Sequence, residues 1–158
     1  MKVLSIANHK GGTGKTATAR ALGDYLAGKG YQVLLVVNAI VASDGILIPT
    51  QLMPVDITGV RRFMNITNEI RTNLSTNARI LGILPTFYDG RYNAHQASLE
   101  AMRAAEWPIM DVYIGRSVRV GEAAAQGESV LSYAPDNPQA ENYLKLGKVI
   151  ELWLKKTN

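Results

Sequence analysis

The sequence predicts an α/β domain built in three layers, with a mainly parallel sheet of about five strands. Two observations support this fold class. Short apolar runs of strand length alternate with longer stretches of helical periodicity along the 158 residues, a pattern typical of parallel sheets covered by helices. A glycine-rich segment, residues 10–16, joins the first apolar run to the first helical stretch. That strand-loop-helix context is typical of a phosphate-binding loop.

The first predicted elements surround this glycine-rich segment. Residues 2–8 form a short apolar strand, and the following helix carries Ala19, Leu22 and Leu26 at helical spacing before Gly28 ends it. Residues 32–37 are mostly Val and Leu, which is typical of a strand buried on both faces of a parallel sheet. We therefore expect a right-handed strand-helix-strand unit.

The remaining chain continues the alternation. The predicted elements are strand 45–49, helix 55–71, strand 79–85, helix 93–106, strand 111–114, short helix 118–126 and terminal helix 137–156. No internal repeat, linker or low-complexity tract separates them. We therefore expect a single domain over residues 1–158.

Composition narrows the classes of protein to consider. A hydrophobic content of 47% allows a core that folds without cross-links, and the absence of cysteine excludes disulfides and thiolate metal sites. The chain starts without a signal-peptide pattern, and its longest apolar run, residues 33–42, has about half the length that spans a bilayer. We expect a cytoplasmic protein without a transmembrane segment, whose net charge of +4 permits contact with a polyanion.

Residues 8–16, N-H-K-G-G-T-G-K-T, predict a phosphate-binding loop. Glycines let the backbone turn tightly, so that successive N–H groups and the positive end of the helix dipole face an anion. Lys15 can then reach the β- and γ-phosphates, and the Thr16 hydroxyl can bind Mg²⁺. We predict that ATP or ADP with Mg²⁺ is bound by Gly11, Gly12, Thr13, Gly14, Lys15, Thr16 and Ala17.

The loop departs from the common pattern, because His9 replaces the first glycine and a second lysine, Lys10, follows it. Residues 10–16, K-G-G-T-G-K-T, resemble the deviant Walker A box of the ParA and MinD group of ATPases. In that group the early lysine acts across a dimer, on the phosphates bound by the other protomer. The resemblance implies catalytic roles for Lys10 and Lys15 and an ATP-bound homodimer. The alternative for Lys10 is a solvated loop cation.

Further stretches resemble bacterial ParA (Soj-type) partition ATPases, in the order of that family. They are residues 41–49 (V-A-S-D-G-I-L-I-P), 80–86 (I-L-G-I-L-P-T) with 88–89 (Y-D), and 114–120 (I-G-R-S-V-R-V). The resemblance implies a P-loop NTPase-like fold, a role in DNA partition and ATPase activity. It also implies non-specific binding of DNA in the nucleoid and a ParB-like partner that stimulates hydrolysis.

One part of the family pattern is absent after about residue 37. Residues 33–36 resemble the family strand that continues into D-x-D-P-Q-G, but here Val37 and Asn38 lead directly into residues 39–44. The missing segment holds the family aspartate that positions the attacking water and a second one that supports Mg²⁺. We therefore expect phosphate binding to be better retained than hydrolysis.

The missing segment also supplies the family strand beside the first strand. We expect residues 32–37 to take that place, which gives the strand order 2-1-3-4-5 when the predicted strands are numbered along the chain. A swapped or dimeric arrangement is the alternative, because exposed apolar strand edges recruit partners. The junction is also compatible with a shortened or engineered form. Asp44 and Asp89 are candidates to replace the absent carboxylates, but both occupy predicted turns.

Five cations late in the chain are candidates for neutralising DNA phosphates. They are Arg91, Arg116, Arg119, Lys145 and Lys148. Because these cations form no dense basic run, a scatter of solvated charges is the alternative.

The terminal helix supports a second candidate function. Leu146, Val149, Ile150 and Trp153 form an apolar stripe flanked by lysines, as in helices that lie on membranes, and MinD-type relatives use a C-terminal helix in this way. The same stripe can instead cover the sheet. A third candidate is a nucleotide-binding module without turnover, since the family aspartates are missing.

Overall fold

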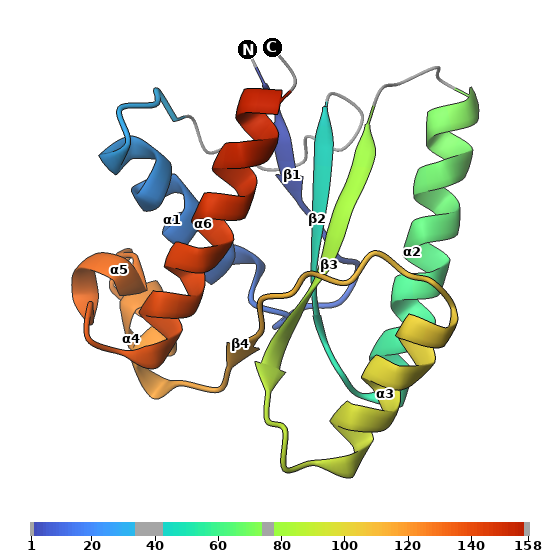
Figure 1. Ribbon diagram of the computed structural model, residues 1–158. Helices are drawn as coiled ribbons and strands as arrows, with labels where there is room; N and C mark the ends of the chain where they lie inside the picture. Colours follow the sequence, from blue (N-terminus) through green and yellow to red (C-terminus); the bar gives the residue numbers. More distant parts are fainter. Residues whose placement is uncertain (1, 34–42, 74–77, 157–158) are drawn as a thin grey trace.

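The computed structural model describes residues 2–33, 43–73 and 78–156. Figure 1 shows a sheet between two groups of helices, which confirms the three-layer α/β class. The elements are β1 (Leu4–Ile6), α1 (Lys15–Gly28), β2 (Gly45–Gln51), α2 (Pro54–Asn73), β3 (Arg79–Tyr88), α3 (Asn93–Ala104), β4 (Ile114–Gly115), α4 (Val118–Ala125), α5 (Val130–Tyr133) and α6 (Pro138–Lys156).

The described strands are all parallel and lie in the order β1-β2-β3-β4. This order agrees with the predicted one for these four strands, but the described sheet has one strand fewer than expected. The predicted strand 32–37 falls mainly on residues outside the described ranges, and Gln32 and Val33 at its start form no strand. Its predicted place beside β1 therefore stays a prediction.

Several element boundaries differ from the predicted ones. β3 extends to Tyr88 instead of ending at residue 85, and β4 covers Ile114–Gly115 instead of 111–114. α3 ends at Ala104, two residues early, and Glu106 beyond it has a φ of 55° that a right-handed helix does not allow. α5 is a four-residue helix absent from the prediction, and it starts where the Ser129 side chain accepts a hydrogen bond from the Leu131 N–H.

The core lies on both faces of the sheet, because β2 is apolar on both faces. Ile46, Leu47 and Ile48 are each 0% exposed. Leu47 belongs to the cluster that joins the sheet to α1 and α6, whereas Ile46 and Ile48 belong to the cluster under α2 and α3. Alternate side chains of one strand therefore hold the two helix layers on opposite faces.

α6 uses its apolar stripe to cover the sheet. Leu146 and Ile150 are buried, and the Trp153 ring packs against Gly45 of β2. Val149 differs from the rest of the stripe, with 41% exposure. This packing favours a sheet-covering helix over one that lies on a membrane. None of the helices formed by the described residues is long and apolar enough to cross a membrane.

Candidate nucleotide-binding site

The glycine-rich loop runs from the end of β1 to the start of α1, as predicted. Gly12 and Gly14 have φ values of 73° and 84°, and Gly14 precedes the first residue of the helix. Only glycine adopts such backbone angles without strain. The Gly14 carbonyl accepts a hydrogen bond of 2.9 Å from the Thr18 N–H, which starts the helix directly after the turn.

Side chains from the carboxyl ends of β2 and β3 hold the loop. The Thr86 hydroxyl donates to the Thr13 carbonyl at 3.1 Å, and the Gln51 amide donates to the Gly12 carbonyl at 3.2 Å. At the start of the loop, the Asn8 amide donates to the Pro49 carbonyl at 2.7 Å. The loop is therefore fixed to the edge of the sheet where parallel α/β proteins bind ligands.

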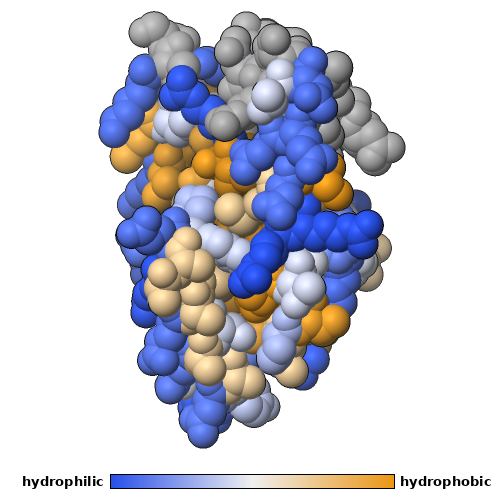
Figure 2. All heavy atoms as spheres, turned by 90° about the vertical axis from the view of Figure 1, so that its right-hand side faces the viewer, coloured by the Kyte–Doolittle hydropathy of each residue, from blue (hydrophilic) through white to orange (hydrophobic). Residues whose placement is uncertain are grey.

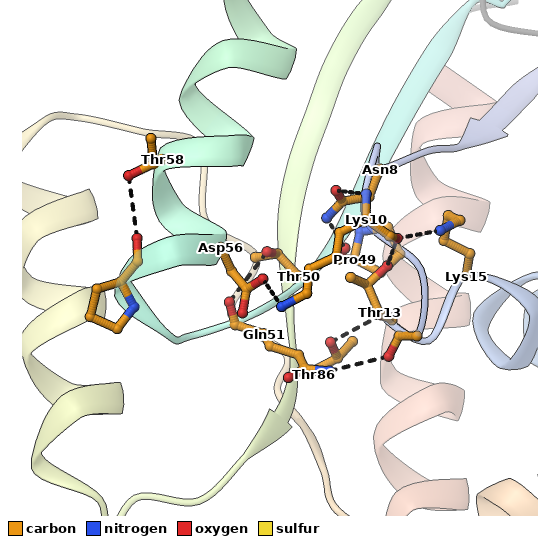
Figure 3. A network of polar contacts seen from close by, with 12 residues as sticks. Asn8, Lys10, Thr13, Lys15, Pro49, Thr50, Gln51, Asp56, Thr58 and Thr86 are labelled. Carbon is orange, nitrogen blue, oxygen red and sulfur yellow. Dashed lines mark hydrogen bonds and ion pairs between the residues drawn. The ribbon is translucent and has the colours of Figure 1, made fainter.

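The two lysines of the loop extend to different sides of it (Figure 3). The Lys15 ammonium donates to the Lys10 carbonyl at 2.7 Å and stays at the loop. The Lys10 ammonium instead forms an ion pair of 2.5 Å with Asp56, in the first turn of α2. Sequence analysis missed this partner, because Asp56 carries only the general signal of an acidic residue near a helix N-terminus.

A cavity of about 310 Å³ opens beside the loop. Its walls come from the loop and the start of α1, the ends of β3 and β4, α4 and α6; they are Gly12, Gly14, Lys15, Thr16, Ala17, Thr86, Phe87, Ile114, Gly115, Ser117, Val120, Gly121, Ala124 and Tyr143. Five of the seven predicted nucleotide-binding residues line this cavity, and Gly11 and Thr13 do not. Thr13 is buried, with its carbonyl bound by Thr86.

Phe87 is a wall residue that sequence analysis missed. Its φ of 53° is unusual for a bulky side chain. The pairing of β3 with β4 shifts register at this point, between Thr86 opposite Ile114 and Tyr88 opposite Gly115. A bulge of this kind redirects a side chain at the end of a strand, and here Phe87 lines the cavity.

The residues present suit a nucleotide and a magnesium ion. The cavity has the size of a small-molecule site, and it combines a glycine-rich helix N-terminus with Lys15 and an apolar wall. No group of three or more His, Cys, Asp or Glu in the described ranges could hold a metal by itself. Mg²⁺ would therefore depend on Thr16, water and the phosphates, which is a common arrangement for this ion.

The candidate replacement carboxylates have structural partners. Asp44 accepts a hydrogen bond of 2.7 Å from the Val3 N–H. Asp89 forms an ion pair with Arg91, and hydrogen bonds from Arg91 lower the pKa of Asp89 from 3.8 to about 2. Among the described residues, it is Asp56, and not one of these two, whose carboxylate forms an ion pair with the loop.

The predicted DNA-binding cations are distributed along the chain, with only Lys145 and Lys148 sharing an element, α6, and three of the five form ion pairs. Arg91 pairs with Asp89, Arg119 with Glu122 at 3.0 Å, and Lys145 with Glu141 at 2.8 Å. Arg116 and Lys148 are exposed. Further exposed cations, Arg61 and Arg62, lie on α2. Figure 2 shows the side of the molecule that carries α2 and α3, where hydrophilic and hydrophobic residues are intermixed. The five predicted cations thus lie on several parts of the fold rather than on one element.

Comparisons with known proteins agree with this site. The model of the CobQ/CobB/MinD/ParA nucleotide binding domain matches residues 4–130. The chromosome-partitioning ATPase Soj of Thermus thermophilus is 31% identical over 142 residues, which cover 82% of this chain and 57% of Soj. The sporulation initiation inhibitor protein Soj of Bacillus subtilis is 32% identical over 118 residues, or 74% of this chain and 47% of that protein. The chain thus spans about half the length of these curated relatives.

Solved structures share the fold at lower sequence identity. The cell division ATPase MinD of Pyrococcus furiosus has a TM-score of 0.71 and 16% identity, covering 96% of this chain and 99% of MinD. Cobyrinic acid a,c-diamide synthase of Mycobacterium smegmatis, with bound ATP analog and magnesium, has a TM-score of 0.79 and 15% identity, covering 100% of this chain and 97% of the synthase. The predicted P-loop NTPase-like fold and the resemblance to ParA and Soj are confirmed.

Proposed function

This chain belongs to the CobQ/CobB/MinD/ParA nucleotide-binding family, with Soj and ParA partition proteins among its relatives, and on that premise we propose that it is an ATP-binding protein of DNA partition. The observation that carries the proposal is the cavity beside the loop, which Lys15 and Thr16 line. In this proposal the loop binds the phosphates, Lys15 neutralises them and Thr16 supports Mg²⁺.

The residues that line the cavity suggest where each end of ATP lies. The loop residues give the cavity a polar lining, and Phe87, Val120 and Tyr143 give it an apolar and aromatic lining. A flat, apolar base fits against such side chains. We therefore place the triphosphate at the loop and the base between β3, α4 and α6.

ATP binding is proposed to pair two copies of the chain, with Lys10 of each acting on the partner's phosphates. The position of Lys10 supports this proposal, because Lys10 does not line the cavity of its own chain, whereas Lys15 does. Lys10 and Lys15 would then act on two different nucleotides.

Hydrolysis is proposed to be slow in the chain alone. Phosphoryl transfer needs groups that orient the attacking water and neutralise developing charge. Asp56, the described carboxylate that contacts the loop, is engaged by Lys10. Two alternative functions therefore remain: a nucleotide-binding module that does not hydrolyse ATP, and a MinD-like positioning ATPase.

DNA binding and a ParB-like partner are the further parts of the proposal. Pairing two copies would double the number of exposed cations, such as Arg116 and Lys148, on one assembly. Non-specific DNA binding depends on the number of phosphates neutralised, so retention on DNA should require ATP and fall steeply with salt.

Calorimetry with ATP and Mg²⁺ tests the proposal, with phosphate release followed in the same samples. We expect binding by the wild type and at least a tenfold loss in Lys15→Ala, since a phosphate loses its charged partner. Lys156→Ala, which removes an exposed lysine at the end of α6, is the matched control and should bind as the wild type does. Equal binding by the wild type and Lys15→Ala, or none by either, would refute the nucleotide site.

A further inference from the structure

The ion pair between Lys10 and Asp56 is unequal in its exposure. The Lys10 side chain is 42% exposed, whereas that of Asp56 is 1% exposed. The two residues are 46 positions apart and join the start of the loop to α2. Figure 3 shows the Lys10 side chain extended toward Asp56, away from Lys15.

Asp56 depends on Lys10 for the compensation of its charge. Its Oδ1 atom accepts from the Lys10 ammonium, whereas Oδ2 is buried and has no hydrogen-bond partner among the described residues. A buried carboxylate that loses its cation is strongly destabilised. Moving Lys10 away from Asp56 is therefore unfavourable as long as Asp56 keeps its charge.

A second contact fixes the same part of the loop to α2. The His9 ring lies against Gly59, where a Cβ atom would come within 2.0 Å of the ring. Gly59 stands one helical turn after Asp56, so neighbouring turns of α2 hold two successive loop residues. The ion pair is thus part of a built contact between the loop and the helix.

We infer that Asp56 is a positioning residue that retains Lys10 within its own chain, so that pairing of two ATP-bound chains requires transfer of Lys10 from Asp56 to the partner's phosphates. This inference rests on the proposed function, in which Lys10 acts across a dimer. Asp56 would then set the ATP concentration at which the chain dimerises, because the phosphates must compete with a buried carboxylate for one ammonium.

The first experiment tests, without nucleotide, whether the ion pair with Asp56 restricts the reactivity of the Lys10 ammonium. Reductive methylation by formaldehyde, followed by peptide mass spectrometry, reports the availability of each lysine. We expect Lys10 to react several times faster in Asp56→Asn than in the wild type, with other lysines unchanged. Glu69→Gln is the matched control, because it removes an exposed carboxylate from the same helix.

The second experiment measures the consequence for dimerisation. Sedimentation with the non-hydrolysable analogue AMPPNP and Mg²⁺ should show a dimer dissociation constant about tenfold lower in Asp56→Asn, a factor that corresponds to one charge-assisted hydrogen bond. This tighter dimerisation should be lost when Lys10→Gln is combined with Asp56→Asn. Asp56→Ser is a second variant without the carboxylate, in case Asp56→Asn does not fold. Circular dichroism checks the folding of both variants.

The outcomes separate this inference from the proposed function. Unchanged labelling of Lys10 in the neutral variants would overturn the inference, as would a tighter dimer that persists after Lys10→Gln. Faster labelling together with a tighter, Lys10-dependent dimer supports it. Faster labelling without a dimer in any variant supports the hold on Lys10 and refutes the proposed dimer instead.

Discussion

Gly147→Ala tests the packing that places α6 against α1, the helix that starts at the nucleotide-binding loop. Gly147 is buried in the interior of α6. A Cβ atom there would lie 2.5 Å from Cγ, 2.6 Å from Cδ1 and 2.8 Å from Cδ2 of Tyr25. The Tyr25 ring would have to retreat by about 1 Å to reach ordinary contact. Its hydroxyl donates to Glu151 at 2.9 Å and resists this movement.

Two opposing effects set the expected magnitude. Overpacking a rigid ring costs about 1–3 kcal/mol, and replacing glycine by alanine inside a helix gains about 1 kcal/mol. Because ring atoms, rather than the end of a flexible side chain, are in the way, we expect the cost to lie in the upper part of that range, about 2–3 kcal/mol. The free energy of unfolding should then fall by about 1–2 kcal/mol after the helix-propensity gain is subtracted. For a chain of this size the melting temperature should fall by about 2–8 °C.

Urea unfolding followed by circular dichroism measures this change. The matched control is Gly121→Ala in α4, where a Cβ atom would meet nothing within 4 Å. In this control the free energy of unfolding should rise by up to about 1 kcal/mol, from helix propensity alone. A Gly147→Ala chain as stable as the wild type, or more stable, would refute the packing argument.

Three further predictions concern the end of β3 and the turn that follows it. Thr86→Val should lower stability by about 1 kcal/mol and weaken ATP binding, since the Thr13 carbonyl loses its donor; calorimetry and thermal unfolding check this, with Thr86→Ser unaffected. Carbon NMR should show that the pKa of Asp89 lies near 2. Because this pKa is lowered from 3.8 in the folded chain, the stability that Asp89 contributes is complete above pH 3.8 and is lost as pH falls toward 2. In Arg91→Gln the pKa of Asp89 should rise. Phe87→Gly should be more stable than Phe87→Ala by about 1 kcal/mol in urea unfolding, because φ at this position is positive.

The local pattern of the sequence was enough to predict the fold class and the loop. The apolar residues of β2 are buried on both faces, as a continuous apolar run predicts. Gly12 and Gly14 take the positive φ values that a phosphate-binding turn requires. These features follow from residues adjacent in sequence, so that a short window contains the information that determines them.

Only the tertiary structure decided which distant residues complete the site. Asp56 meets Lys10 across 46 positions, and Thr86 meets Thr13 across 73. No periodicity in sequence indicates such pairs, because they depend on how β2, β3 and α2 come together at one edge of the sheet. The bulge that turns Phe87 into the cavity likewise depends on the register between β3 and β4. Sequence thus determined the loop, and packing between distant strands and helices determined its partners.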